Sequence, residues 1–381
     1  METGKQKPTG PLAGVRVVEM AGIGPGPFCG MLLADLGADV VIVDRLQAGE
    51  DAIDLGSHAI SRRGKRSVAV DLKTAEGRET VLRLIEQSDA LIEGMRPGVM
   101  ERLGLGPDVC LQRNPHLVYG RMTGWGQDGP LAQAAGHDIN YIALSGALWY
   151  SGQPGEAPMA PPSLVGDIGG GAMYLAVGLL AGIMQVRAGG PGQVVDAAIV
   201  DGSAHMMSLL FGLQAAGHMP RTRGRGMLDG PHWYNTYRCA DGEFITVGAL
   251  EPKFYRELRE RLGLAEDPAY TTQHDADQWP ALRERLTELF ASRDRATWCA
   301  LLEGTDACFA PVLSPDEAAR HPHLRARGTY TEADGVLQAN PAPRFSATPA
   351  ARPGPIPGRG EHTAAVLADW TRDAPRAGRS S

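Results

Sequence analysis

Short runs of β-branched residues alternate with apolar, helix-length segments through the first half of the chain. Residues 15–20 and 39–44 have the length and composition of buried strands. Between them lie a glycine-rich loop and an apolar segment, residues 28–36, that is long enough for a helix. A strand, a loop, a helix and a second strand within about thirty residues form a βαβ unit, from which doubly wound sheets are built.

The same alternation continues beyond this unit. Further strands are expected at residues 68–72, 90–93 and 117–121, and a long helix is expected from residue 171 to about residue 186. Strands that alternate with helices place the chain in the α/β class with a parallel sheet. We therefore expect a Rossmann-like large domain over residues 1–221.

The pattern changes at residues 222–229, which are polar and glycine-rich and indicate a linker. Beyond it, Asp241-Gly242 stands between two strand-like runs and predicts a β-hairpin, and three helix-length segments follow. These features predict a smaller α+β domain over residues 222–330. Residues 331–381 are expected to form a C-terminal segment that returns to the large domain.

Charge and cysteine spacing narrow the class of protein. The net charge is −7 and no block is rich in lysine or arginine, so nucleic acid is not an expected partner. The five cysteines are scattered without CxxC spacing, which favours reduced thiols over disulfides or zinc. The first residues are polar, and the apolar run at residues 172–186 is too short to span a bilayer. We expect a cytoplasmic protein without a membrane partner.

Two loops in the first half are candidate binding elements. Gly22-x-Gly24-x-Gly26 lacks the third glycine of a dinucleotide fingerprint, so it is either a plain strand-to-helix turn or a loop whose backbone approaches an elongated ligand. Basic residues at 62–66 precede a strand. They are either a solvated charge run or part of a phosphate site, because strand ends face the ligand crevice in open α/β sheets.

Asp167 is the carboxylate with the most unusual surroundings. Glycines flank it at 166 and 169–171, and an apolar helical run follows. It is either a simple helix cap or part of a helix start whose free N–H groups could stabilise an oxyanion. Three consecutive glycines cost a helix roughly 1 kcal/mol each relative to alanine, which favours close approach of a ligand over capping alone.

His137 and Glu251 are weaker candidates from the residues alone. A single histidine between Gly136 and Asp138 is either a hydrogen-bonded structural residue or an acid/base group that Asp138 orients. Glu251 follows a strand and precedes a proline-started helix, where a solvated first-turn acid is the simpler interpretation. No Gly-x-Ser-x-Gly, Walker or His-Glu-x-x-His motif is present, which disfavours those hydrolases and NTPases.

Several motifs together resemble one known family. The chain is similar to the family III CoA-transferase superfamily, and within it to the α-methylacyl-CoA racemase group, in order over residues 11–365. The motifs that carry the resemblance are Ala21-Gly22-Ile23-Gly24-Pro25-Gly26-Pro27, Arg96-Pro97-Gly98-Val99, Met122-Thr123-Gly124-Trp125-Gly126-Gln127, Gly136-His137-Asp138-Ile139-Asn140-Tyr141, Gly192-Gln193-Val194-Val195-Asp196-Ala197, Met227-Leu228-Asp229-Gly230, Ala240-Asp241-Gly242-Glu243-Phe244, Val247-Gly248-Ala249-Leu250-Glu251-Pro252 and Gly304-Thr305-Asp306-Ala307-Cys308.

The resemblance implies a racemase or epimerase of 2-methylacyl-CoA thioesters that works as an interlocked homodimer without a metal or redox cofactor. His137 and Asp167 would be the acid/base pair, Asp138 would support the site, and Glu251 would reach His137 from the partner chain. The motif matches also imply contacts to CoA from Ile23, Arg45, Val70, Leu72, Lys73, Arg96, Arg102 and Tyr141.

Two other functions stay open. A true CoA-transferase of the same superfamily would use Asp167 as a nucleophile that forms an aspartyl-CoA anhydride, and would not rely on a histidine such as His137. A catalytically idle CoA-binding homologue would not need His137, Asp167 and Glu251 together. The chain departs from the family pattern at residues 231–234, just before the small domain, which leaves the shape of the acyl pocket open but not the proton chemistry. The acyl chain itself stays open between a branched fatty acid, a sterol side chain and a secondary-metabolite precursor.

Overall fold

The computed structural model describes residues 9–47, 55–333, 335–350 and 353–370. The chain divides into two compact units, and each is described by itself. The first unit comprises the described residues of 1–145, 161–206 and 330–381, and the second those of 146–160 and 207–329. This division differs from the expected domain boundaries because residues 146–160 and 207–221 belong to the second unit.

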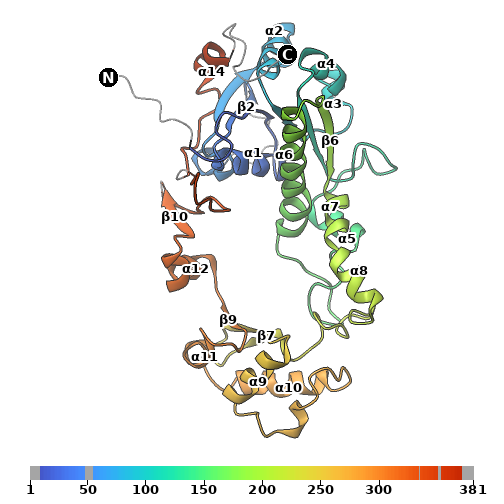
Figure 1. Cartoon of the computed structure of the whole chain (residues 1–381), viewed down its shortest axis with the longest axis vertical. Helices are drawn as coiled ribbons and strands as arrows, with labels where there is room; N and C mark the ends of the chain where they lie inside the picture. Colours follow the sequence, from blue (N-terminus) through green and yellow to red (C-terminus); the bar gives the residue numbers. More distant parts are fainter. Residues whose placement is uncertain (1–8, 48–54, 334, 351–352, 371–381) are drawn as a thin grey trace. The chain divides into compact units, whose positions relative to one another are not determined.

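The first unit is built on a six-stranded parallel sheet with the strand order β3-β2-β1-β4-β5-β6 (Figure 1). The strands are β1 (Arg16–Met20), β2 (Asp39–Arg45), β3 (Arg66–Val70), β4 (Ala90–Glu93), β5 (Val118–Thr123) and β6 (Gln193–Ala198). The predicted α/β class and Rossmann-like sheet are confirmed. The strand order reverses between β1 and β4, and ligands of open α/β sheets bind outside the carboxyl ends of the strands at such a point.

Helices cover both faces of this sheet. The helices of the unit are α1 (Pro25–Asp35), α2 (Ala75–Glu86), α3 (Val99–Arg102), α4 (Pro107–Arg113), α5 (Asp138–Ser145), α6 (Met173–Arg187), α7 (Ile199–Met206) and α14 (Thr363–Trp370). Val17 of β1 packs in a core with residues of α1 and α6, whereas its neighbour Val18 packs in a second core with residues of α2 and α14. Consecutive side chains of a strand point to opposite faces, so a strand buried on both sides reads as a continuous apolar run.

The second unit contains a three-stranded antiparallel sheet, β7 (Tyr234–Arg238), β8 (Phe244–Gly248) and β9 (Phe309–Val312). Its helices are α8 (Ser208–Ala215), α9 (Pro252–Arg261), α10 (Trp279–Phe290), α11 (Arg295–Leu302), α12 (Pro315–Arg320) and α13 (Pro322–Ala326). Asp241-Gly242 lies in the predicted turn between β7 and β8, where Gly242 has a φ of 85°. Trp233, Trp279 and Trp298 lie in the core of this α+β unit.

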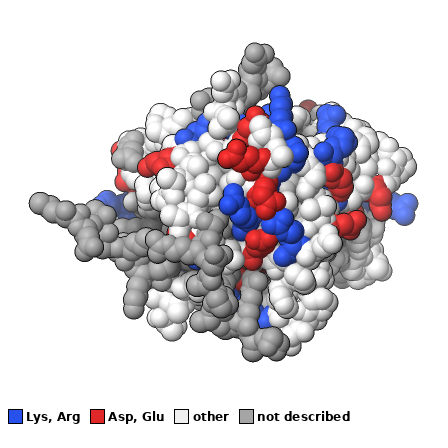
Figure 2. Space-filling view, turned by 90° about the horizontal axis from the view of Figure 1, so that it is seen from above, with Lys and Arg blue, Asp and Glu red and all other residues white. Residues whose placement is uncertain are grey.

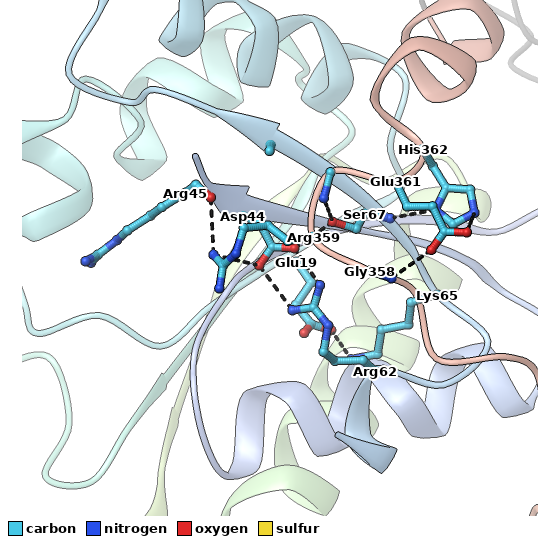
Figure 3. Close-up of polar contacts among 12 residues, drawn as sticks. Glu19, Asp44, Arg45, Arg62, Lys65, Ser67, Gly358, Arg359, Glu361 and His362 are labelled. Carbon is cyan, nitrogen blue, oxygen red and sulfur yellow. Dashed lines mark hydrogen bonds and ion pairs between the residues drawn. The ribbon is translucent and has the colours of Figure 1, made fainter. Parts of the chain in front are cut away.

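The C-terminal part of the chain lies against the sheet of the first unit. It begins with the hairpin β10 (Tyr330–Ala333) and β11 (Val336–Ala339), and residues 358–363 then run along β3. The N–H of Gly360 donates to the Ser67 hydroxyl at 2.7 Å, and the N–H of His362 donates to the Ser67 carbonyl at 2.9 Å (Figure 3). Because β3 is at the edge of the sheet, these bonds cover an otherwise open strand.

One apolar helix is longer than expected. The structure joins a π-helical segment, η3 (Leu164–Ala172), to α6, which gives a helix of 24 residues that contains an 18-residue window with a mean hydropathy of 1.6. By length and composition alone this helix could cross a membrane. The core helix of a folded domain passes the same test, and Leu175, Leu179 and Ile183 of α6 are buried against the sheet.

A buried ion pair fixes the start of α1. Lys65 Nζ donates to Glu19 Oε2 at 2.6 Å and to the carbonyl of Pro27 at 2.8 Å, and both side chains are almost fully buried (Figure 3). Gly30 of α1 is required here, since a Cβ at that position would lie 1.8 Å from the Glu19 carboxylate. The pair thus ties the first turn of α1 to β1.

We expect Lys65→Met to lower the free energy of unfolding by about 3–5 kcal/mol, because it leaves the Glu19 carboxylate buried without a partner. The double variant Glu19→Leu, Lys65→Met should lose less than the single variant, since it buries no unpaired charge. Urea unfolding of both variants measures the difference. A single variant as stable as the wild type would contradict this account of the pair.

Candidate active site

A cavity of about 510 Å³ opens at the carboxyl ends of β1, β4 and β5. Its wall is formed by the loops that follow these strands, residues 20–27, 94–97 and 122–125, and by residues near the start of α5 and on η3. This first cavity lies at the reversal point of the strand order, where ligands of open α/β sheets bind. His137 and Asp167, the two predicted acid/base residues, both line it.

His137 lies immediately before α5. The Asn140 side chain accepts a hydrogen bond from the His137 N–H at 3.0 Å, and the Asn140 N–H donates to the His137 carbonyl at 2.8 Å. This reciprocal pair satisfies backbone groups that a helix start leaves free. The backbone of His137 is thereby fixed while its imidazole stays exposed at the cavity.

Tyr141 holds the peptide before His137. Its hydroxyl donates to the carbonyl of Gly136, and its ring packs edge-on against Trp125 with 4.7 Å between the ring centroids. The ring fits only because two neighbours are glycines. A Cβ on Gly124 would lie 2.0 Å from the Tyr141 ring, and a Cβ on Gly136 would lie 2.8 Å from it. The role of Trp125 was not predicted individually, although it lies in one of the family motifs.

Asp167 lies in the first turn of η3, not at the end of a regular α-helix. Single π-helical turns are rare and are frequent at functional sites. Ser163 precedes the segment with a left-handed φ of 58°, and its side chain lowers the pKa of the Asp167 carboxyl. No sequence signal pointed to Ser163, because nothing in its neighbours predicts a π-helix.

The backbone N–H of Asp167 is not a free oxyanion donor, which corrects the interpretation from sequence. It donates to Asp138 Oδ1 at 2.7 Å, and Asp138 is itself buried. Asp138 therefore orients the segment that carries Asp167. Its role beside His137 stays a prediction. Glycine at 166 is necessary for this, because a Cβ there would lie 2.5 Å from Asp138 Oδ1.

The glycines that follow Asp167 serve helix packing, which also differs from the expected approach of a ligand. A Cβ on Gly170 would lie 2.3 Å from the Ser203 hydroxyl of α7, and one on Gly171 would lie 3.0 Å from Ile199. Glycine is required at position 202 of α7 for the same reason, because a Cβ there would lie 1.9 Å from the Gly170 carbonyl oxygen. Small residues on both helices let the two backbones come into direct contact.

Burial raises the pKa of the Asp167 carboxyl above its ordinary value, and the nearby Asp138 charge raises that pKa further. The side chain of Ser163 and the charge of His137 lower this pKa in part. A carboxyl group in such surroundings is a better proton acceptor than a solvated aspartate. His137 and Asp167 line the same cavity, so the charge of each acts on the other.

All but one of the residues expected to contact CoA line two adjoining cavities. Ile23, Arg45, Arg96 and Tyr141 line the first cavity. A second cavity of about 580 Å³ lies beyond the ends of β2 and β3, and it is lined by Arg45, Val70, Leu72 and Lys73 among others. Arg45 and Met95 border both cavities, so the two form a continuous crevice. Arg102 lines neither cavity.

The crevice contains three basic side chains that form no ion pair with a described residue, although Asp71 and Asp167 also line it. Within the part of the chain that the structure describes, the side chains of Arg45, Lys73 and Arg96 have no carboxylate within 4.0 Å. On the face seen in Figure 2, by contrast, acidic and basic side chains are interspersed. Basic groups at strand ends without carboxylate partners are suited to phosphate.

Glu251 belongs to the second unit, where it precedes α9. It is exposed at the N-cap position and its side chain caps no backbone group of that helix, which agrees with the simpler interpretation of a solvated acid at a helix start. Cys308 is close enough that the Glu251 charge contributes to a raised pKa of its thiol, after burial. The role of Glu251 beside His137 stays a prediction.

The departure at residues 231–234 affects the core of the second unit. His232 and Trp233 are fully buried, and His232 Nε2 bonds to the Tyr255 hydroxyl at 2.8 Å. Burial lowers the pKa of His232 to about 3, so this imidazole is neutral. Of residues 232–234, only Tyr234 is exposed. For His232 and Trp233 the departure therefore lies in the core packing of the second unit.

No group of three or more histidine, cysteine, aspartate or glutamate side chains among the described residues could hold a metal ion. What the first cavity brings together is one histidine, one aspartate of raised pKa and arginine side chains. Such a set can bind an anionic ligand and move protons.

Comparison with known proteins gives three findings. Residues 12–363 match the family described as CoA-transferase family III. The chain is 44% identical to the α-methylacyl-CoA racemase of Mus musculus, over 94% of this chain and 93% of that protein, and 43% identical to that of Homo sapiens over the same shares. The crystal structure of a CAIB/BAIF family protein from Brucella suis superposes with a TM-score of 0.79 at 29% identity and covers 95% of this chain and 100% of that chain.

Proposed function

The chain belongs to CoA-transferase family III, and on that premise we propose that it racemises 2-methylacyl-CoA thioesters by proton transfer between His137 and Asp167. The observation that carries the proposal is that these two residues line one cavity next to unpaired arginines. The similarity to two curated racemases over most of the chain supports the same reaction.

The proposed reaction exchanges a proton at the α-carbon next to the thioester carbonyl. One residue removes the α-proton, the electrons of the C–H bond form an enolate, and the second residue delivers a proton to the opposite face. Neutral imidazole with protonated carboxyl, and imidazolium with carboxylate, are the two resting states, and each turnover converts one into the other. The raised pKa of Asp167 supports this exchange, because it narrows the gap to the pKa of a histidine.

The CoA part of the substrate would occupy the crevice formed by the two cavities. Arg45, Lys73 and Arg96 would hold its phosphates, and the apolar Val70 and Leu72 would lie along the nucleotide. The chemistry needs no metal or redox cofactor, since the thioester itself delocalises the charge. We place the enzyme in the cytoplasm, with acyl-CoA as its small-molecule partner and neither nucleic acid nor membrane as a partner.

The proposal includes a homodimer in which Glu251 of the partner chain reaches His137. The outer face of α6 supports it: Met173, Val177 and Met184 are exposed at helical spacing, and Met184 is 72% exposed. Apolar side chains in such a stripe are usually covered by another surface. We expect a second copy of the chain to cover this apolar stripe. Glu251, the third proposed site residue, belongs to the second unit, and the proposal takes it from that second copy.

A charge placed in this stripe should therefore dissociate the dimer. We expect Val177→Glu to shift the protein from dimer to monomer in analytical ultracentrifugation and to lower racemase activity at least tenfold, because a buried unpaired carboxylate is costly. Arg83→Glu, on the exposed face of α2, is the matched control and should leave the dimer intact. A wild-type protein that sediments as a monomer would refute the shared site.

The CoA-transferase reaction is the second candidate, because Asp167 in the cavity could also act as a nucleophile. A non-catalytic CoA-binding homologue is the third. His137 in the same cavity favours racemisation, since a transferase does not require it.

Incubation with a single enantiomer of a 2-methylacyl-CoA in deuterated water separates the three. Deuterium at the α-carbon together with loss of optical purity is the expected result. Transfer of CoA to an added free acid without deuterium uptake would establish the transferase, and binding without either change would establish the idle homologue. A panel of branched fatty acyl, sterol side-chain and secondary-metabolite CoA thioesters would then identify the acyl chain.

A further inference from the structure

Two arginines share one aspartate at the end of β2 (Figure 3). Asp44 accepts hydrogen bonds from Arg62 through both carboxylate oxygens, at 3.1 and 2.5 Å, and a third from the Ser67 hydroxyl at 2.6 Å. Arg359 of the C-terminal segment approaches the same carboxylate only to 3.9 Å. Arg62 makes the closer pair, so the positive charge of Arg359 is in excess at this edge of the sheet.

Arg359 contacts β2 through the backbone of Arg45. Its Nη1 donates to the Arg45 carbonyl at 3.2 Å, at the last residue of the strand. Figure 3 shows the Arg45 side chain extending away from this guanidinium. That side chain borders both cavities of the crevice. Arg359 thus holds the peptide from which a predicted phosphate-binding arginine projects.

The position of Arg359 is itself fixed by the edge strand. The adjacent Gly360 donates its N–H to the Ser67 hydroxyl, and Ala69 donates its N–H to the Thr363 hydroxyl at 3.1 Å. Gly360 has a φ of 68°, and a Cβ there would lie 2.8 Å from the Ala69 side chain. Glycine is therefore required at 360, and the segment crosses β3 in one defined way.

We propose that Arg359 is a positioning residue of the CoA-binding crevice: it holds the end of β2 so that Arg45 meets a phosphate of the nucleotide. The C-terminal segment is then a functional part of the crevice and not only a cover for the sheet edge. The inference rests on the proposed function only in taking CoA as the ligand. It predicts an effect on the nucleotide half of the substrate and none on proton transfer.

Arg359→Met removes the hydrogen bond to Arg45 and the excess charge. We expect calorimetric titration with free CoA to show about tenfold weaker binding, as for loss of one charge-assisted hydrogen bond. The KM for a 2-methylacyl-CoA should rise by a similar factor while kcat is unchanged. With the corresponding pantetheine thioester, which lacks the nucleotide, variant and wild type should behave alike. That comparison within one protein separates positioning from loss of fold.

The double variant Arg45→Met, Arg359→Met tests whether Arg359 acts through Arg45. If it does, Arg359→Met adds little once Arg45 is absent, because positioning a missing side chain has no effect. Fully additive losses, or a KM that rises equally for the pantetheine thioester, would overturn the proposal. Arg359→Gln is a milder second variant in case the first is unstable. Arg320→Met, at an exposed end of α12, is the matched control.

These outcomes are distinct from failure of the proposed function. A wild-type protein that binds CoA without racemising any thioester would refute racemisation, yet the titrations would still test Arg359. A wild type that does not bind CoA would refute both. Unchanged CoA affinity in Arg359→Met, with normal racemisation, would refute the positioning role alone.

Discussion

His137→Ala and Asp167→Asn should each lower the rate of racemisation by about 10³-fold or more. General acid–base catalysis contributes typically 10²–10⁴-fold, and each turnover needs both groups, one as the base and one as the acid. Asp167→Asn is the sharper variant because it keeps the size of the side chain and removes only its titration. The measurement is polarimetric or chiral-chromatographic interconversion of a 2-methylacyl-CoA under saturating substrate.

The controls for this prediction lie in the same unit. His116→Ala removes an exposed histidine that does not line the crevice, and it should leave the rate unchanged. CoA binding by both active-site variants should stay near that of the wild type, because neither residue is expected to contact the nucleotide. A fully active Asp167→Asn would remove Asp167 from the acid/base pair.

The second large effect is a pair of opposite shifts in pH dependence. When Asp167 acts as base, activity requires its carboxylate and falls as pH falls through the pKa of that group. Burial raises this pKa, so the acidic limb of kcat/KM for that enantiomer should lie at higher pH than for an ordinary aspartate. Asp138→Asn removes the neighbouring charge and should move the limb to lower pH. Ser163→Ala removes a polar side chain that lowers this pKa, so it should move the limb to higher pH.

These two variants test whether electrostatics set the pKa of Asp167. A general disturbance of the structure would not be expected to shift the acidic limb in opposite directions in the two variants. The Asp138→Asn side chain keeps an amide oxygen that can still accept the hydrogen bond from the Asp167 N–H, so the backbone is preserved. The profile is measured as kcat/KM against pH for each enantiomer separately. Shifts in the same direction for both variants would show that the surroundings of Asp167 are misassigned.

The fold of the first unit was well predicted because each of its elements is encoded in a short, contiguous stretch of sequence. Each strand is a short apolar run, and a βαβ unit is complete within a few dozen residues, so β1, α1 and β2 follow from the sequence of that stretch alone. Burial on both faces makes the runs continuous, as at Val17 and Val18, which favours the parallel sheet over an alternating one.

The site was predicted less well because its determinants are distant in sequence. The N–H of Asp167 donates to Asp138, 29 positions earlier in the chain. Gly170 and Gly171 pack against α7, which comes later in the chain. No local pattern distinguishes a glycine needed by a ligand from one needed by a neighbouring helix. His137 was an ordinary histidine from the residues alone, and the family resemblance identified it.

The cover on β3 has a consequence for synthesis of the chain. Ser67 leaves the ribosome 293 residues before Gly360, its hydrogen-bond partner. Throughout translation of the intervening chain, the edge strand therefore exposes backbone groups of the kind that recruit other strands. A truncated product that ends before Gly358 would keep that exposed edge permanently, and cells would have to shield it with a chaperone or degrade it.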